Sequence, residues 1–387
     1  MAPGIYEPIV QELVNQIGLE SGWRVQFEQA VHDAVAQAPD DMQGIETLGD
    51  FYNFLNSFLT WVPFEGSGGR EIYKKLCLFY FIFGRKSVYP LQTEIKPSTA
   101  GQPLTWLSDW LVRYAQEIGK FMDTPESLTE ESLETFRKEP AYHMEDYLEP
   151  HGGWKTFNQF FARNVKPGYR PIANMANSEV IVSPADSTFE DQWPVDSDSI
   201  INIKGLPWSI SELLKDSKYA NDFKGGSFMH SFLSPTDYHR MHAPVGGKVL
   251  ETKLIPGQVY LDVTSDDEGK LQPIRHIDPA PGKDLRDLDA QDATGYQFCQ
   301  ARGLVVLDTE IGLVAVLPIG MAQVSSVILT AEEGKTLFKG EEIAYFQFGG
   351  SDIVIVFQAG SKVNITTERG THNNVGVQIG TAKVPSK

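Results

Sequence analysis

The organisation of this chain is clearest in Phe346-Gln347-Phe348-Gly349-Gly350-Ser351-Asp352-Ile353-Val354-Ile355-Val356-Phe357. Aromatic and β-branched residues on both sides of the glycine pair predict two strands separated by a turn. Glycine permits backbone conformations that a side chain would forbid. The hydroxyl of Ser351 can therefore reach the carbonyl carbon of Gly350, which is the geometry that a chain needs in order to cut itself.

The same stretch also fits a plain β-hairpin turn with a solvent-exposed serine. Gly-Gly-Ser is a common loop tripeptide, and the stretch taken alone favours this plain turn. Self-cleavage requires a base to activate the serine and an acid to orient that base, both from elsewhere in the chain.

The composition is that of a globular protein. The 387 residues predict roughly two domains of about 150 residues each. A hydrophobic content of 41% and a charged content of 22% are sufficient for a sizeable core. The formal net charge of −18 disfavours nucleic acids and anionic membranes as partners, because these carry charge of the same sign.

Cysteine usage and apolar runs predict a cytoplasmic protein. The two cysteines, Cys77 and Cys299, are far apart in sequence and support neither a disulfide framework nor a cysteine metal site. Cys77 lies in an apolar run, so we expect a buried free thiol. The first residues show no secretory signal pattern. The longest apolar run, 76–83, is shorter than the roughly 20 residues of a membrane span and predicts a core element.

The first 123 residues predict helices. Ile5, Ile9, Leu13 and Ile17 recur at a spacing of four and form one apolar stripe. Thr129, which precedes two glutamates, indicates the start of another helix. Prolines and glycines between residues 140 and 153 then indicate a boundary, which gives a helical domain 1–148 and a second domain 149–387.

The second domain has the pattern of a β-rich fold. Short β-branched runs separated by glycine and proline predict strands at 180–182, 200–203, 248–250, 303–307 and 313–317. The acidic, polar segment 265–292 predicts a long loop. The fold class expected from these patterns is α+β, with helices first and strands after them.

Two histidines lie in Tyr238-His239-Arg240-Met241-His242-Ala243-Pro244. As a pair three residues apart on a helix, they could bind a metal, but Pro244 would end that helix and no third ligand cluster is apparent. We therefore expect no metal. A general base that titrates near neutral pH is a second interpretation, and a pair of structural histidines is a third.

Two further motifs carry polar residues. Asp186 follows a β-branched strand in Ser183-Pro184-Ala185-Asp186-Ser187, where it fits either a turn or the carboxylate that orients a histidine. Aromatic residues at helical spacing in residues 157–161 indicate packing. Arg163 and Arg170, which follow them, fit partners of carboxylates.

Taken together and in order, these motifs resemble the phosphatidylserine decarboxylase family of pyruvoyl enzymes. The resemblance covers residues from about 150 to 387. It rests on four motifs: Phe157-x-x-Phe160-Phe161-x-Arg163 with Arg170-Pro171, Ser183-Pro184-Ala185-Asp186, Tyr238-His239-Arg240-x-His242-x-Pro244, and Lys339-Gly340 leading to Phe346-x-Phe348-Gly349-Gly350-Ser351.

The resemblance implies a mechanism of self-cleavage. Asp186 would orient His242, and His242 would deprotonate Ser351, which attacks the carbonyl of Gly350. The products would be a β chain of residues 1–350 and an α chain of residues 351–387 that begins with a pyruvoyl group. That group would form a Schiff base with a substrate amine and accept electrons as CO₂ leaves. His239 would contact the substrate carboxylate or return the proton. A homodimer and barrel-sandwich-like elements are also implied.

The substrate that the resemblance implies is a free amino acid. The Phe-Gly-Gly-Ser motif and the N-terminal helices are similar to a soluble subgroup that includes fungal L-tryptophan decarboxylases, whereas phospholipid enzymes usually have Leu-Gly-Ser-Thr. Gly349 and Asp352 depart from the phospholipid pattern, while Asp186 agrees with it. Phosphatidylserine therefore stays an alternative substrate.

Two non-catalytic interpretations also stay open at this point. A barrel-sandwich binding module is one, since residues 332–344 resemble carrier domains but lack their attachment lysine motif. A family member that never cuts itself is the other, although the Asp186, His242 and Ser351 set is intact.

Overall fold

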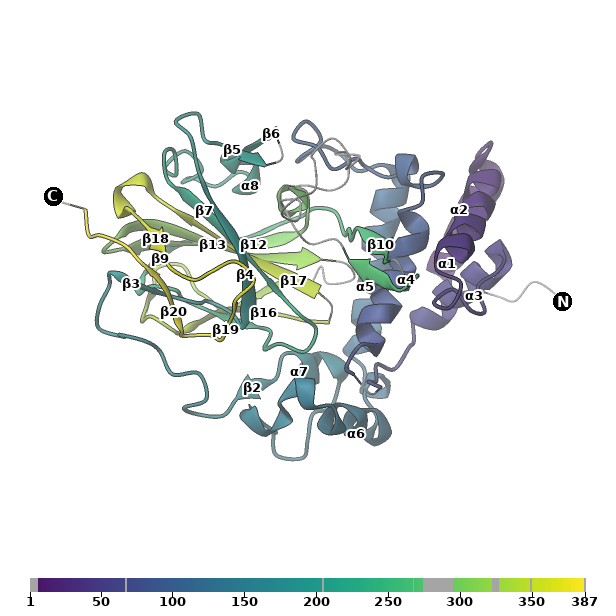
Figure 1. Cartoon of the computed structure of the whole chain (residues 1–387), viewed down its shortest axis with the longest axis horizontal. Coiled ribbons are helices and arrows are strands. Elements are labelled where there is room, and N and C mark those ends of the chain that lie inside the picture. Colours follow the sequence, from purple (N-terminus) through teal and green to yellow (C-terminus); the bar gives the residue numbers. More distant parts are fainter. Residues whose placement is uncertain are drawn as a thin grey trace.

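The computed structural model describes residues 6–66, 68–203, 205–266, 268–273, 295–321, 327–348 and 350–385. Helices α1 to α5 lie at one end of the molecule and the large sheet at the other, as Figure 1 shows. One continuous hydrophobic core includes buried residues of both regions.

The helical region forms as its apolar spacing predicts. Its helices are α1 (Pro8–Leu19), α2 (Trp23–Gln37), α3 (Leu48–Phe58), α4 (Glu71–Phe83), α5 (Trp106–Met122) and α6 (Glu130–Lys138). Thr47 caps α3 and Thr129 caps α6, each through a reciprocal capping box that satisfies backbone N–H groups at the helix start. The apolar run at 76–83 lies in α4 and, Leu78 apart, is buried, which confirms the prediction of a core element.

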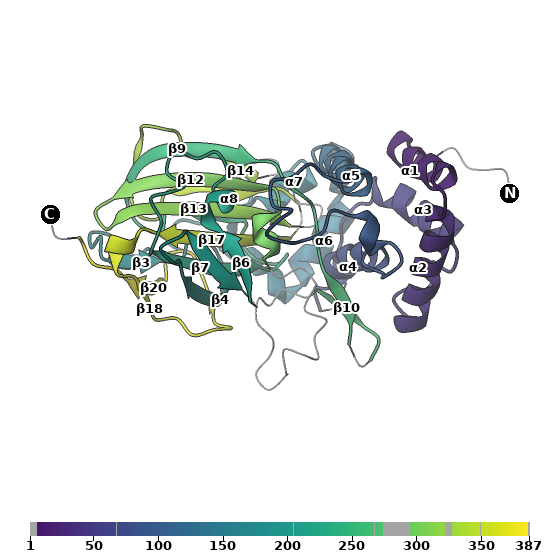
Figure 2. The same cartoon turned by 90° about the horizontal axis from the view of Figure 1, so that it is seen from above.

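The central feature of the β-rich region is an antiparallel sheet of eight strands. In spatial order they are β15 (Thr336–Leu337), β9 (Gly247–Ile255), β12 (Arg302–Thr309), β13 (Gly312–Met321), β17 (Gly350–Phe357), β7 (Ser227–Leu233), β4 (Ser187–Pro194) and β19 (His372–Asn373). Strand β17 therefore lies inside the sheet, paired with β13 on one side and β7 on the other. Figure 2 shows β9, β12, β13, β17, β7 and β4 side by side, seen from above.

Two three-stranded sheets accompany the large one. They contain β14 (Val327–Leu329), β16 (Glu342–Phe346) and β8 (Arg240–His242), and β18 (Asn364–Ile365), β20 (Gln378–Thr381) and β3 (Val180–Val182). Two-stranded pairs are β1 (Tyr147–Leu148) with β2 (Asn164–Val165), β5 (Ile200–Ile203) with β6 (Leu206–Ser209), and β10 (Val263–Ser265) with β11 (Leu271–Pro273). The short helices α7 (Phe157–Phe161) and α8 (Ile210–Leu213) belong to the same region.

Several predictions from the sequence can be judged against this architecture. The α+β class is confirmed, with helices first and a large antiparallel sheet after them. The plain hairpin is wrong, because β16 pairs with β8 and β14 in one sheet while β17 pairs in another. Ser351 is fully buried rather than exposed. The boundary at 148/149 stays a prediction.

The predicted long loop at 265–292 is wrong at its start. Residues 271–273 form β11, which pairs with β10 in a hairpin that contacts α4 of the helical region. The backbone N–H of Leu271 donates to Asp41 (2.9 Å), and Arg85 Nη2 donates to the carbonyl of Val263 (3.3 Å). The remainder of the predicted loop, 274–292, lies outside the described residues.

The helices and the two cysteines bear on the predictions about membrane spans and thiols. No helix in the described part of the chain is both long enough and apolar enough to span a bilayer. Cys77 and Cys299 are both buried thiols rather than halves of a disulfide, and burial raises the pKa of the Cys299 thiol to about 12.

Candidate active site

Ser351 lies at the start of the central strand β17. It is opposite Gly320 of β13 and Leu233 of β7, and it has no exposed surface. The apolar run that follows it, Ile353–Phe357, is buried on both faces of the sheet, so the strand is fixed by packing as well as by its ladder. A hydroxyl in this position is shielded from bulk water and held by a rigid element.

His239 is the histidine that contacts this serine. Its Nδ1 lies 3.4 Å from Ser351 Oγ, and its Nε2 lies 3.4 Å from the carbonyl oxygen of Pro235. A carbonyl only accepts, so Nε2 carries the proton in this arrangement and Nδ1 presents a lone pair to the hydroxyl. Both contacts are at the long end of hydrogen bonding, as is common in resting active sites.

The position of the His239 ring is set by its neighbours. Phe161 of α7 stacks on it with ring centroids 3.9 Å apart and an interplanar angle of 20°. The backbone N–H of Phe346 donates to the His239 carbonyl (2.9 Å), which ties the histidine to the last residue of β16. The imidazole is consequently buried against an aromatic face rather than exposed to solvent.

His242 has a different environment. Its Nδ1 donates to the Gly340 carbonyl (2.8 Å), and the Tyr238 hydroxyl lies 3.0 Å from its Nε2. In the neutral ring, which carries its proton on Nδ1, Nε2 accepts from the tyrosine hydroxyl. Burial lowers the pKa of His242, which favours the neutral form. Both ring nitrogens are thus occupied by groups other than Ser351.

Asp186 is held by an arginine. Arg170 donates from Nη2 and Nε to its carboxylate, with a shortest distance of 2.6 Å, and the Val375 N–H donates to Oδ1 (2.7 Å). The His242 backbone N–H donates to the carbonyl of Pro184 (2.7 Å), which brings the turn of Asp186 beside β8. Within the described ranges no hydrogen bond joins the Asp186 and His242 side chains. Burial lowers the pKa of His242, and the negative charge of Asp186 offsets only part of that lowering.

Arg163 and Arg170 contact different kinds of group. Arg170 pairs with carboxylates, those of Asp186 and Asp146. Arg163 is buried and donates to the backbone carbonyls at 236 and 237, with its guanidinium over the ring of Tyr147 at 4.1 Å. A cation over an aromatic face is stabilised without a carboxylate partner.

No structural role was predicted from the sequence for two groups near Ser351, although Asp352 was noted as a departure from the phospholipid pattern. Asn158 of α7 accepts from the backbone N–H of Phe348, two residues before Gly350 (2.9 Å). Asp352, the residue after Ser351, receives a hydrogen bond from the Tyr296 hydroxyl (2.6 Å) and lies 3.2 Å from His230 Nε2. Because side chains alternate along a strand, Asp352 lies on the opposite face of β17 from Ser351.

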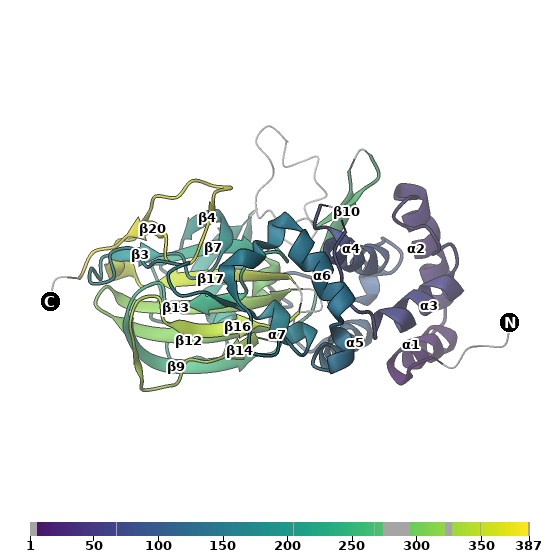
Figure 3. The same ribbon diagram turned by 90° about the horizontal axis from the view of Figure 1, so that it is seen from below.

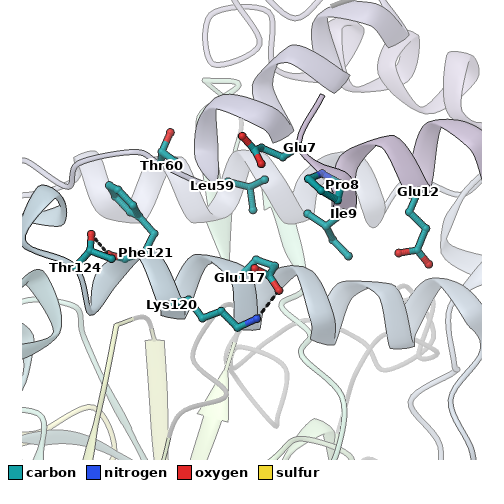
Figure 4. Close-up of a pocket in the computed structure, with 10 residues that line it drawn as sticks. All are labelled: Glu7, Pro8, Ile9, Glu12, Leu59, Thr60, Glu117, Lys120, Phe121 and Thr124. Carbon is teal, nitrogen blue, oxygen red and sulfur yellow. Dashed lines mark hydrogen bonds and ion pairs between the residues drawn. The ribbon is translucent and has the colours of Figure 1, made fainter. Parts of the chain in front are cut away.

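Two cavities differ in their distance from the predicted site residues. One of about 400 Å³ is lined by Asn158 and Gln347, beside the segment that leads to Gly350. Another of about 590 Å³ lies between α1 and α5 in the helical region, where Figure 4 shows three glutamates around it. None of the predicted site residues lines the second cavity. The described residues contain no group of three or more metal-ligating side chains.

The comparisons with known proteins agree with the motifs. A family model described as phosphatidylserine decarboxylase matches residues 157–381, which is more than half of the chain. Phosphatidylserine decarboxylase proenzyme 3 of Schizosaccharomyces pombe is 33% identical over 241 residues, 62% of this chain. This chain spans only 22% of the length of that relative.

Other relatives match over most of their own length. A phosphatidylserine decarboxylase proenzyme of Fusobacterium nucleatum is 31% identical over 71% of this chain and 81% of the relative. Decarboxylase iboD of Amanita muscaria is 30% identical over 72% of this chain and 82% of the relative. The resemblance to the family is confirmed, while the tryptophan decarboxylase subgroup stays a prediction. On the matched motifs, the buried Ser351 and the extent of these matches, the chain belongs to the phosphatidylserine decarboxylase family.

Proposed function

We propose that this chain is a pyruvoyl-dependent decarboxylase that cuts itself between Gly350 and Ser351 and then removes CO₂ from an amino acid. The observation that carries the proposal is the contact of 3.4 Å between Ser351 Oγ and His239 Nδ1, buried at the start of β17. Ser351 directly follows Gly350 and lies next to a histidine whose ring is stacked on an aromatic side chain. A hydroxyl and a neighbouring base are the groups required for attack on the Gly350 carbonyl.

The first step is an exchange of bonds at Gly350. The proton of Ser351 Oγ passes to His239 Nδ1, an O–C bond forms to the Gly350 carbonyl carbon, and the C–N bond breaks as the nitrogen takes a proton. β-Elimination from this ester removes the α-proton of residue 351 to a base and breaks its Cβ–O bond, which leaves the Gly350 carboxylate and a dehydroalanine at residue 351 that tautomerises to an imine. Addition of water then releases ammonia and leaves a pyruvoyl group at residue 351.

His242 and Asp186 have a supporting place in this proposal. The sequence-based hypothesis gives the proton transfer to His242, whereas the contact with Ser351 favours His239 for the uncut chain. The neutral His242 holds Gly340 and Tyr238, and Asp186 anchors Arg170 and Val375 beside it. We assign these two residues to holding the site in shape, and the cleavage rates of His242→Ala and His239→Ala test this assignment of His242 against the base role.

In the decarboxylation, the pyruvoyl group would supply a carbonyl that binds the substrate amine and accepts electrons. The residues of this chain supply the surroundings. The buried rings of Phe161 and Phe346 pair with the ring of His239, and apolar surroundings of this kind favour a charged carboxylate leaving as neutral CO₂. We assign to His239 the contact with the substrate carboxylate or the return of a proton to the substrate carbon.

A free amino acid, aromatic and tryptophan-like, is the substrate that we propose. The net charge of −18 gives little attraction to an anionic leaflet, and the described residues contain no membrane-spanning helix. Phosphatidylserine is the second candidate, favoured by the names of most of the similar relatives. We further propose a cytoplasmic homodimer of cut protomers.

The deciding experiment is the intact mass of freshly purified protein under denaturing conditions. We expect two species that divide between Gly350 and Ser351, the smaller with the mass change of serine to pyruvoyl, and one uncut species for Ser351→Ala. Cleavage of Ser351→Ala at the same bond would refute the site. A screen with tryptophan, other amino acids and phosphatidylserine in vesicles then separates the substrate candidates.

A further inference from the structure

The segment that leads to the proposed cleavage bond is held by the helical region. Asn158 Oδ1 accepts from the Phe348 N–H (2.9 Å), and Asn158 Nδ2 donates to Asp123 Oδ1 (2.9 Å). Asp123 is the residue that directly follows α5, and its Oδ1 also accepts from Gln347 Nε2 (3.4 Å). Figure 3 shows α7, which carries Asn158, between β16 and α5.

The hydrogen-bonding capacity of these groups fixes the direction of the link. A backbone N–H only donates, and the Asp123 carboxylate only accepts, so the group between them must accept on one side and donate on the other. An asparagine amide does both. A weaker contact from Asn158 Nδ2 to the Gly119 carbonyl (3.4 Å) holds the same orientation. The side chain is 3% exposed, so an unsatisfied group there would be costly.

Packing supports the same segment. Phe348 is 3% exposed and contacts the rings of Phe157 and Phe161 of α7, at 5.4 and 6.0 Å between centroids. Phe161 also stacks on His239, and the Phe346 N–H donates to the His239 carbonyl. Helix α7 therefore contacts both His239, beside Ser351, and Phe348, in the segment between β16 and β17 that leads to Gly350.

We infer that Asp123 of the helical region and Asn158 of α7 are positioning residues for self-cleavage. Through this pair, the helical region fixes residues 347–348 so that the Gly350 carbonyl faces Ser351. The inference rests on the proposed function, because the role it assigns is in the cleavage reaction. It gives the N-terminal helices a part in maturation beyond their contribution to the core.

The pair permits a reciprocal test. In Asn158→Asp, two carboxylates face each other and the donor to Asp123 is lost. In the double variant Asp123→Asn, Asn158→Asp, the amide introduced at position 123 donates to the carboxylate introduced at position 158. That carboxylate still accepts from Phe348, and the Gln347 amide can turn over to match. Asn164→Asp, an exposed position on β2, is the matched control for the change of charge.

Two measurements are made on the full-length chain. Cleavage is followed by intact mass from the uncut precursor. Amide hydrogen exchange of the peptide that contains Phe348 is measured in a Ser351→Ala background, with the Ile353–Phe357 strand as the internal reference for folding.

We expect Asn158→Asp to slow cleavage about tenfold or more and to speed exchange at Phe348. The double variant should recover both to within about threefold of the parent chain, and Asn164→Asp should change neither. Cleavage of Asn158→Asp at the parent rate overturns the inference, as does a double variant no faster than Asn158→Asp. A parent chain that never cuts refutes the proposed function, whereas unchanged Phe348 exchange in Asn158→Asp refutes this link, so the two failures are distinct.

Discussion

The two histidines near Ser351 differ by their hydrogen bonds. His239 presents Nδ1 to the hydroxyl, while both nitrogens of His242 are engaged by Gly340 and Tyr238. Their spacing in sequence would let them share one face of a helix, but His242 ends a short extended segment. In extended chain, residues an odd number apart point to opposite sides, so only one of the two can face the serine.

This difference predicts unequal effects of substitution. His239→Ala should slow cleavage by about 10²- to 10⁴-fold, the usual contribution of a general base, and His242→Ala should slow it less. The rates are measured by intact mass from uncut precursor at one temperature. If His242→Ala stays uncut while His239→Ala matures like the parent chain, the base is His242 and our assignment fails.

A surface histidine offers a prediction on pH. His372 Nε2 lies 2.9 Å from Asp237 Oδ1, and this hydrogen bond raises the pKa of His372 above its ordinary 6.5. The folded state thus binds the proton more tightly than the unfolded chain, so the stabilisation is fully present below pH 6.5 and is lost as pH rises through the raised pKa.

Thermal unfolding of His372→Gln in the Ser351→Ala background tests this sign. The variant should melt below the parent at pH values under 6.5, and the difference should close as the solution becomes alkaline. His151→Gln, an exposed histidine in a turn, serves as the control. A gap that widens towards alkaline pH would contradict the assigned direction.

At the scale of elements, the loop that carries Arg170 is attached to the turn of Asp186 by a buried ion pair. Their side chains are 8% and 4% exposed. Removing one partner of such a pair leaves an uncompensated charge, so Arg170→Met should lower the free energy of unfolding by about 3–5 kcal/mol. Arg170→Lys should retain only part of this stabilisation, because an ammonium group cannot reproduce the two-pronged contact of the guanidinium with the carboxylate.

Denaturant unfolding in the Ser351→Ala background measures these losses. Arg137→Met is the comparison, since Arg137 contacts three glutamates at the surface, where ion pairs contribute about 1 kcal/mol or less. Equal losses of unfolding free energy in Arg170→Met and Arg137→Met would contradict the prediction, because the buried ion pair would then contribute no more to stability than the surface one.

The elements themselves differed in how well the sequence predicted them. Strand β3 is a continuous β-branched run, and β13 contains the apolar run 313–317, so the local pattern was sufficient to predict both. The β10–β11 hairpin was missed because each of its strands has three residues and its packing against α4 is a long-range contact. The same limit explains the wrong hairpin at 346–357, since the partners of β16 and β17 are distant in sequence and local pattern does not identify them.

At the scale of the whole molecule, cleavage should not separate the two chains. The proposed α chain, 351–387, contains β17 between β13 and β7, β19 against β4, and β20 against β3. Each of these ladders joins it to the proposed β chain, and the apolar face of β17 is buried.

Native gel filtration tests this cohesion. The matured protein should elute with the Ser351→Ala precursor, and the two chains should separate only in denaturant. A small fragment that elutes alone under native conditions would show that the ladders around β17 are weaker than their burial implies.

The interior position of β17 affects the order in which the chain folds and cuts itself, and how it refolds afterwards. Ser351 lies beside His239 in a strand that is inserted between its two neighbours. On the proposed mechanism, a cut chain is therefore one that has already reached its native topology. The precursor folds as a single chain, at a rate independent of concentration. A matured molecule that is denatured must instead find its short chain by collision, and dilution slows that encounter. Maturation would thus turn a reversible, unimolecular refolding into a bimolecular one that few molecules complete.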